Sequence, residues 1–151
     1  MQPFFKVMSE QQFHHSIPIQ LRFNDSDVLG HVNNSVYFTF YDLGKTEYFE
    51  KVLPGITSNR NVGVVIASIH VDFQLPVFPG EKVEVLTAVT EIGEKSFKLL
   101  QHLVDSETRE VKCVCRTVMV GYNASTKTSY AIPAEWRNAI SKFENKDFSA
   151  E

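Results

Sequence analysis

The sequence has few of the residues that mark specialised classes of protein. Its 151 residues include only 2 Cys, 7 Gly and 6 Pro. These small numbers exclude a disulfide-rich scaffold, a collagen-like repeat and a low-complexity chain. Long apolar runs are also missing, because Gly63 and Ser68 interrupt the run around Val62 to Ile69. A membrane span needs ~20 consecutive apolar residues, so we expect none.

An excess of charge of one sign is missing too. The 15 Lys and Arg residues and 18 Asp and Glu residues give a net charge of −3, whereas nucleic-acid-binding domains are usually basic. The N-terminus lacks the apolar stretch and the small-residue cleavage site of a signal peptide. What is present, 43% hydrophobic and 22% charged residues, is typical of a globular domain. We expect one cytoplasmic domain over residues 1–151, with a leader over residues 1–15 and no nucleic-acid partner.

A long buried helix is the clearest element of the first half. Ile17–Phe23 alternates apolar and polar residues, which predicts a strand. Good N-cap residues at positions 33–35 then precede a predicted helix over Val36–Leu53, which Pro54 and Gly55 end. The first half of this helix is aromatic nearly all round, so we expect it to be buried. Gly44 costs ~1 kcal/mol in a helix interior, which indicates close approach of another backbone.

The second half of the sequence reads as strands joined by short turns. The predicted strands form an antiparallel meander: Val62–Leu75, Lys82–Glu91, Ser96–Asp105 and Glu110–Tyr122. Residues 133–143 predict a short C-terminal helix anchored by Trp136. A curved antiparallel sheet wrapped around the long helix would bury the apolar faces of both, which gives an α+β fold. An edge or face of that sheet would remain for a second copy of the chain.

The two cysteines, Cys113 and Cys115, alternate along a predicted strand and therefore point to the same face. They would lie ~6.6 Å apart along it, near the upper limit for a disulfide. Zinc needs four ligands, or three and a water. We interpret both as ordinary strand residues and predict no metal site.

The loop from Asn24 to Asn34 is the one stretch dense in reactive side chains, and it ends at the predicted helix start. Free N–H groups at a helix N-terminus can stabilise an oxyanion on a carbonyl. A carboxylate upstream could attack that carbonyl or activate a water towards it. Asp25 and Asp27 could instead form an acid–base couple, and Asp and Asn are also ordinary turn and cap residues. Composition alone leaves these interpretations open.

Three segments carry a resemblance to a known family. Residues 23–37 resemble the signature of hotdog-fold acyl-CoA thioesterases of the 4-hydroxybenzoyl-CoA thioesterase type: an aromatic residue, D-x-D, two variable residues, Gly, then a helix with an early Tyr. Residues 72–81 resemble the family's strand–Pro–turn–Gly-Asp/Glu segment, and residues 91–97 its E-x-x-x-K-S-F turn. The resemblance covers about residues 16–123. It implies a hotdog fold, with a long central helix wrapped by a curved antiparallel sheet, and acyl-CoA thioesterase activity.

The resemblance also implies roles for individual residues. Asp27 would be the catalytic carboxylate, as nucleophile or general base, and the Asn34 backbone N–H would polarise the thioester carbonyl. The K-S-F turn would bind the nucleotide end of coenzyme A. The substrate-binding candidates are His31, Asn33, Tyr37, Lys95 and Ser96. The implied assembly is a homodimer or a dimer of dimers with the site at the interface, and no cofactor beyond the coenzyme A of the substrate.

Several alternatives stay open beside this interpretation. Residues 31–34 resemble those of many fatty acyl-CoA thioesterases, which favours aliphatic over aromatic acyl chains. Glu47 is a minor catalytic candidate, because another hotdog subgroup places a Glu in the central helix, although the His-Gly-Gly start of that subgroup is missing. The alternative functions are an acyl-carrier-protein thioesterase, a non-catalytic acyl-CoA-binding module and a hotdog hydratase.

Overall fold

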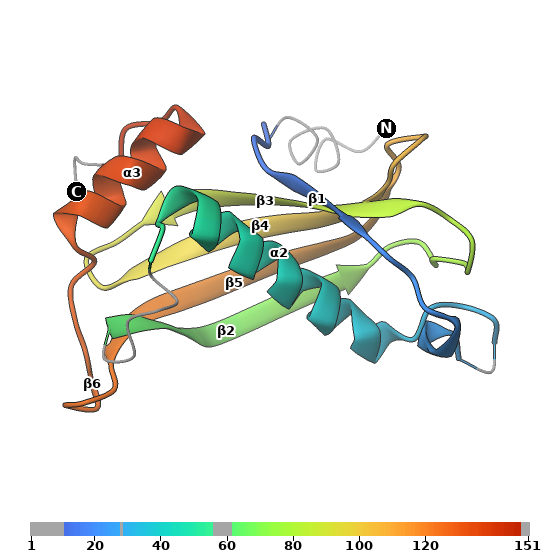
Figure 1. Cartoon of the computed structure of the whole chain (residues 1–151), viewed down its shortest axis with the longest axis horizontal. Coiled ribbons are helices and arrows are strands. Elements are labelled where there is room, and N and C mark those ends of the chain that lie inside the picture. Colours follow the sequence, from blue (N-terminus) through green and yellow to red (C-terminus); the bar gives the residue numbers. More distant parts are fainter. Residues whose placement is uncertain (1–10, 28, 56–61, 149–151) are drawn as a thin grey trace.

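The computed structural model describes residues 11–27, 29–55 and 62–148. A curved antiparallel sheet wraps one side of helix α2, and the shorter helix α3 covers one end of the sheet (Figure 1). The elements in chain order are β1 (Ser16–Ile19), η1 (Phe23–Asp25), η2 (Asn34–Val36), α2 (Tyr37–Val52), β2 (Val62–Phe73), β3 (Val83–Ile92), β4 (Ser96–Asp105), β5 (Val111–Asn123), β6 (Thr128–Ser129) and α3 (Ala134–Glu144). In these described ranges no helix is long and apolar enough to cross a membrane.

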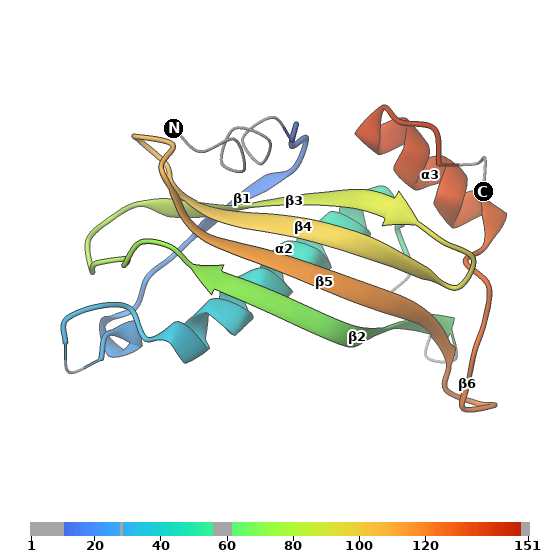
Figure 2. The ribbon, with the colours of Figure 1, turned by 180° about the vertical axis from the view of Figure 1, so that it is seen from behind.

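The strand order is β1-β3-β4-β5-β2, with β6 paired to β5. The predicted meander is therefore correct only from β3 to β5, and its first strand is misplaced. β2 pairs with β5 at one edge of the sheet, so the chain crosses the sheet before β3 begins (Figure 2). The connecting residues 74–82 contain two prolines and are too long for a tight hairpin. Val77 in this connection is fully buried and its carbonyl accepts the Val32 N–H at 2.8 Å.

The first strand is shorter than predicted. β1 ends at Ile19, and a turn of 3-10 helix, η1, replaces its expected second half. The cause is local, because the Asp25 carboxylate accepts the Arg22 N–H at 2.8 Å and pairs with its guanidinium at 3.1 Å. The other predicted strands and α3 begin and end within two residues of the observed bounds.

Helix α2 is buried on one side against the concave face of the sheet. It has 16 residues and follows directly on η2, so the helical segment begins three residues before α2 itself. A Cβ at Gly44 would lie 2.7 Å from Val85 Cγ1 and 2.9 Å from Gln101 Nε2. The close approach predicted at Gly44 is therefore real, but side chains of β3 and β4 make it rather than a backbone.

Two residues of α3, Glu144 and Arg137, hydrogen-bond to distant parts of the chain. Glu144, at the end of α3, is buried, and its Oε2 accepts both the Tyr48 hydroxyl and the Val89 N–H. Arg137 Nη2 donates to the Gly93 carbonyl at 2.7 Å. The predicted leader is joined to the sheet at its end, where the His15 carbonyl accepts the Thr87 N–H at 3.1 Å. Residues 1–10 of that leader lie outside the described residues.

Candidate functional site

The loop that carries Asp27 folds back on itself before the helical segment begins. Ser26 and Val32 form an antiparallel bridge. Two hydrogen bonds of 2.7 Å flank this bridge, from the Asp27 N–H to the His31 carbonyl and from the Asn33 N–H to the Asp25 carbonyl. Asp27 is therefore held beside the segment that leads into η2.

The two oxygens of the Asp27 carboxylate have different surroundings. Oδ1 accepts the Leu29 N–H at 2.9 Å and the His31 N–H at 3.3 Å. The turn is closed by Gly30, whose φ of +83° favours glycine. Among the described residues no donor reaches Oδ2. One oxygen thus shapes the loop and the other stays available for chemistry.

The helix start offers one backbone N–H. Asn33 Oδ1 accepts the Ser35 N–H at 2.9 Å, and the Asn33 carbonyl accepts the Val36 N–H at 3.0 Å. The Asn34 N–H meets no acceptor within the described part of the chain. It lies at the positive end of the helix macrodipole, where negative charge is stabilised. The geometry thus leaves the predicted oxyanion donor free, and shows that the Asn33 side chain serves as a helix cap.

Asp25 and Asp27 do not share an environment. Asp25 is 1% exposed and bound by Arg22, whereas Asp27 is partly exposed and holds its own loop. Each carboxylate has separate partners, so the geometry gives no support to an acid–base couple.

The other candidates on this side differ in burial. The His31 ring packs edge-on against Phe78 at 5.2 Å between centroids. Tyr37 is buried with its ring 5.2 Å from that of Phe73, and burial raises the pKa of its hydroxyl to about 12. Sequence reasoning missed two exposed apolar side chains, Leu29 within the loop and Phe78, which packs against His31 of the loop. The signal for Phe78 was its position in the turn before β3.

Lys95 and Ser96 lie far from Asp27 in the same chain. The end of β1 that leads to the Asp27 loop pairs with Val83, at the start of β3, whereas Lys95 follows the end of β3. A strand of 10 residues spans about 33 Å. Figure 1 shows the loop and the β3–β4 turn at opposite ends of the sheet. One chain does not bring these predicted site residues together.

Glu47 is also remote from the loop. It lies 13 residues beyond Asn34, which corresponds to roughly 20 Å along a helix axis. Its side chain is exposed, and its backbone hydrogen-bonds to the side chain of His15 near β1. The position gives Glu47 no contact with the Asp27 loop.

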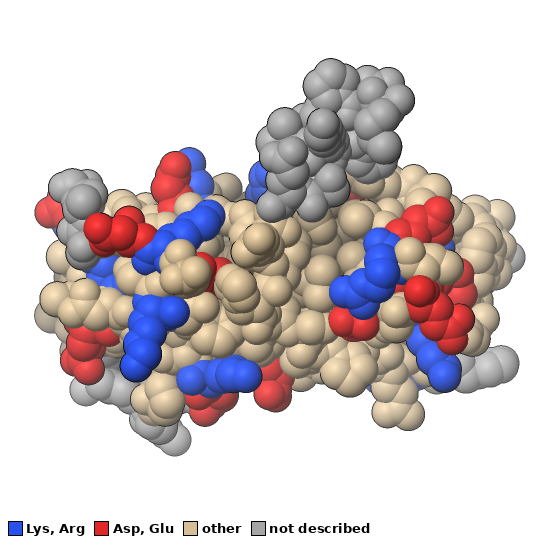
Figure 3. Space-filling model, turned by 90° about the horizontal axis from the view of Figure 1, so that it is seen from above, with Lys and Arg blue, Asp and Glu red and all other residues tan. Residues whose placement is uncertain are grey.

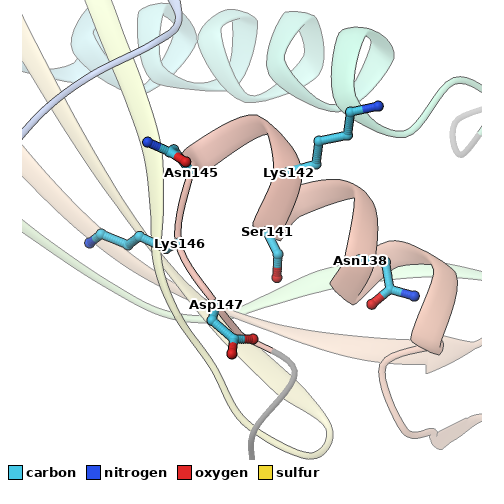
Figure 4. Close-up of a pocket in the computed structure, with 6 residues that line it drawn as sticks. All are labelled: Asn138, Ser141, Lys142, Asn145, Lys146 and Asp147. Carbon is cyan, nitrogen blue, oxygen red and sulfur yellow. The ribbon is translucent and has the colours of Figure 1, made fainter.

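A polar pocket of about 500 Å³ lies at the C-terminal end of α3. Its lining residues are Asn138, Ser141, Lys142, Asn145, Lys146 and Asp147 (Figure 4). The Lys142 and Lys146 side chains extend to opposite sides, so their charges do not converge on one point. We do not assign this pocket to the site.

No metal centre is apparent in the described part of the chain, because no three His, Cys, Asp or Glu side chains group suitably there. Cys113 and Cys115 are buried, free thiols on the strand face that meets α2. Burial raises the pKa of Cys113 to about 12, so its thiol is unreactive. Both lie on β5, as the sequence predicts, with their side chains in the hydrophobic core.

Residues 21–140 match the family described as the thioesterase-like superfamily. This match covers most of the chain. The chain belongs to the thioesterase-like superfamily.

The chain is also similar to solved structures, one of them named a thioesterase, and to a curated relative. The PA5185 protein from Pseudomonas aeruginosa is 28% identical with a TM-score of 0.79, and the match covers 93% of this chain and 96% of that one. A thioesterase from Thermus thermophilus, solved with coenzyme A and Zn, is 25% identical with a TM-score of 0.80 over 91% of this chain and 98% of that one. The uncharacterized protein YsmA from Bacillus subtilis is 28% identical over 81 residues. That match spans only 54% of each chain.

Proposed function

We propose that this protein hydrolyses acyl-CoA thioesters to a free acid and coenzyme A. The observation that carries the proposal is the pairing of Asp27, with Oδ2 available, and the free Asn34 N–H across one hydrogen-bonded loop. Family membership and the thioesterases among the similar structures support thioester hydrolysis. A neighbour solved with coenzyme A supports a ligand of that type. Aliphatic acyl chains are the finer part of the proposal, from the resemblance at residues 31–34.

Two routes of hydrolysis fit the same groups. In the first, the Asp27 carboxylate takes a proton from a water, and the water oxygen attacks the thioester carbonyl. In the second, Asp27 attacks the carbonyl itself, and water hydrolyses the resulting mixed anhydride. In both routes the Asn34 N–H stabilises the oxyanion, the C–S bond breaks and the coenzyme A thiolate leaves. A thiol has an ordinary pKa of ~8.5, so the leaving group needs no strong general acid.

A second copy of the chain is part of the proposal. Among the described residues β2 pairs with β5 alone, so its other edge offers backbone groups to a partner strand. Four large apolar side chains of this strand are about two-fifths exposed: Val65, Ile66, Ile69 and Phe73. An antiparallel pairing of two β2 strands would cover them. Since the two chains then run in opposite directions, the Lys95 end of one copy lies towards the Asp27 end of the other.

Two alternatives are weaker. An acyl-carrier-protein thioesterase would need a basic surface for its acidic partner. On the face shown in Figure 3, Lys and Arg side chains are interspersed with Asp and Glu. A non-catalytic acyl-CoA-binding module would have no use for the available Asp27 oxygen.

The test is release of free thiol from a panel of acyl-CoA thioesters, comparing the wild type with Asp27→Asn. Asn keeps an oxygen that can accept the Leu29 and His31 N–H groups, so the loop should survive while the carboxylate is lost. We expect kcat to fall at least about 100-fold, which corresponds to about 2.7 kcal/mol, with an unchanged Tm. Wild-type turnover that survives in Asp27→Asn would remove Asp27 from the mechanism. No turnover on any thioester, with acyl-CoA still bound, would favour the binding module.

A further inference from the structure

A buried ammonium group lies on one flank of α2 without enough acceptors. Lys45 is 5% exposed, and its Nζ makes no hydrogen bond within the described residues. Its one ion-pair partner there is Asp42, with Nζ 3.5 Å from Oδ1. The Asp42 side chain is itself 68% exposed. A buried ammonium normally satisfies its three donors, so this flank is incomplete in a single copy.

The flank faces the side of the sheet where β2 lies. Burial raises the pKa of the Cys115 thiol, and the charges of Lys45 and Asp42 have smaller, opposite effects on it. Cys115 pairs with Val71 on β2. The other flank of α2, at Glu47, contacts His15 next to β1. The Lys45 and Asp42 charges are therefore on the flank of α2 that is nearer Cys115 of β5, the strand that pairs with β2.

This flank is apolar around its two charges. Phe38 lies on the same flank of the helix, because positions 38, 42 and 45 are three or four residues apart. Phe38 is exposed, as are the side chains of β2 that point to the same side of the sheet, Ile66, Ile69 and Phe73. An exposed apolar surface of this kind with an opposite pair of charges is self-complementary. It suits the isologous contact of a two-fold axis, where the same patch meets itself.

We propose that Lys45 and Asp42 form reciprocal ion pairs across a two-fold axis with a second copy, Lys45 with Asp42 of the partner subunit and Asp42 with Lys45 of the partner subunit. This inference rests on the β2-paired assembly proposed above. It adds that the ion pairs between Lys45 and Asp42 hold the two copies in one register. The ammonium gains an acceptor beyond Asp42, its one ion-pair partner among the described residues, and the exposed carboxylate is covered. The charges also set the register, because a slip of two residues between the β2 strands displaces them by about 6.6 Å.

The experiment uses two charge-reversal variants, Asp42→Lys and Lys45→Glu, alone and mixed. Each variant alone places like charges across the axis, so we expect its dimer dissociation constant to rise at least tenfold by analytical ultracentrifugation. In an equimolar mixture, one chain carries two positive and the other two negative groups on this flank. We therefore expect the mixture to recover a dimer, as a heterodimer that native mass spectrometry identifies. Glu107→Lys, with the same change of charge at an exposed turn, is the control and should dimerise as the wild type does.

The inference is overturned if Asp42→Lys dimerises as tightly as the wild type, or if the mixture forms no heterodimer. Asp42 is exposed, so Asp42→Lys should fold even if Lys45→Glu does not. In that case Lys45→Met replaces Lys45→Glu, and the dimer dissociation constants of Asp42→Lys and Lys45→Met are compared. Thiol release by the wild type is measured separately. A wild-type dimer without thioesterase activity would reject the proposed hydrolysis and keep this inference. An active monomer would keep the hydrolysis and reject both the β2-paired assembly and this inference.

Discussion

The two ends of the sheet are built on different physical principles. At the Asp27 end, short hydrogen bonds between residues close in sequence shape the loop. There Asp27 Oδ2 and the Asn34 N–H have no hydrogen-bond partner among the described residues. At the Lys95 end, contacts between distant residues hold α3 against the β3–β4 turn, through Arg137 and the Gly93 carbonyl, and against α2, through Glu144 and Tyr48. The first end is suited to chemistry because its free groups are held in place locally. The second is suited to support a binding surface, because its turn is fixed by tertiary contacts.

Removing Asp25 should have the largest effect on stability at the Asp27 end. In Asp25→Ala the Arg22 N–H loses its acceptor and the buried carboxylate is gone, which costs about 1–3 kcal/mol. We expect Tm to fall by several degrees in thermal unfolding followed by circular dichroism. Asp25→Asn keeps an acceptor oxygen and should lose less. If Asp25→Ala left Tm unchanged while Asp27→Asn lowered it, the roles of the two carboxylates would have to be exchanged.

Removing a carboxylate charge at the opposite end, at Glu144, should raise the Tm relative to the wild type as pH rises, whereas removing Asp25 should lower the Tm. Burial raises the pKa of Glu144, so its contribution to folding is greatest below the ordinary Glu range and is lost as pH rises through the raised pKa. Glu144→Gln keeps an acceptor for Tyr48 and Val89 but removes the charge. We expect the Tm of the variant relative to the wild type to be higher at about pH 8 than at about pH 5. Glu135→Gln, exposed on the same helix, should show no such difference; an equal shift for Glu144→Gln at both pH values would contradict the prediction.

Sequence patterns predicted the local elements of both ends. Hydrophobic alternation located β3, β4 and β5, and the caps at positions 33–35 located the helix start, because each signal is carried by neighbouring residues. The position of β2 beside β5 was missed, since alternation shows that a strand exists but not which strand it pairs with. The strand predicted through Phe23 was too long because the Arg22–Asp25 contact, a side-chain effect, outweighs the alternation there.

The candidate site was predictable in part for the same reason. The Asp27 loop and the N-cap lie within one continuous segment, so the resemblance could name them together. The separation of Lys95 from Asp27 and the burial of Glu144 depend on which strands are neighbours. The burial of Lys45 is the feature that the sequence was least able to predict, because a Lys in a helix is normally exposed. Only the packed structure shows its ammonium buried beside Asp42.

The smallest effect on activity is expected from a substitution in the β3–β4 turn. There the two ends of the sheet are compared by kcat and KM. Lys95 is exposed, so the attraction for a phosphate of coenzyme A that we propose for it would be screened and worth up to about 1 kcal/mol, or about fivefold in binding. We expect Lys95→Ala to raise KM by up to that factor and to leave kcat unchanged, and added salt to reduce the difference. Asp27→Asn should do the opposite, lowering kcat with little change in KM. Lys127→Ala, at an exposed turn of β5–β6, is the matched control. A loss of kcat in Lys95→Ala would place the turn at the reacting carbonyl and contradict the division of roles between the two ends.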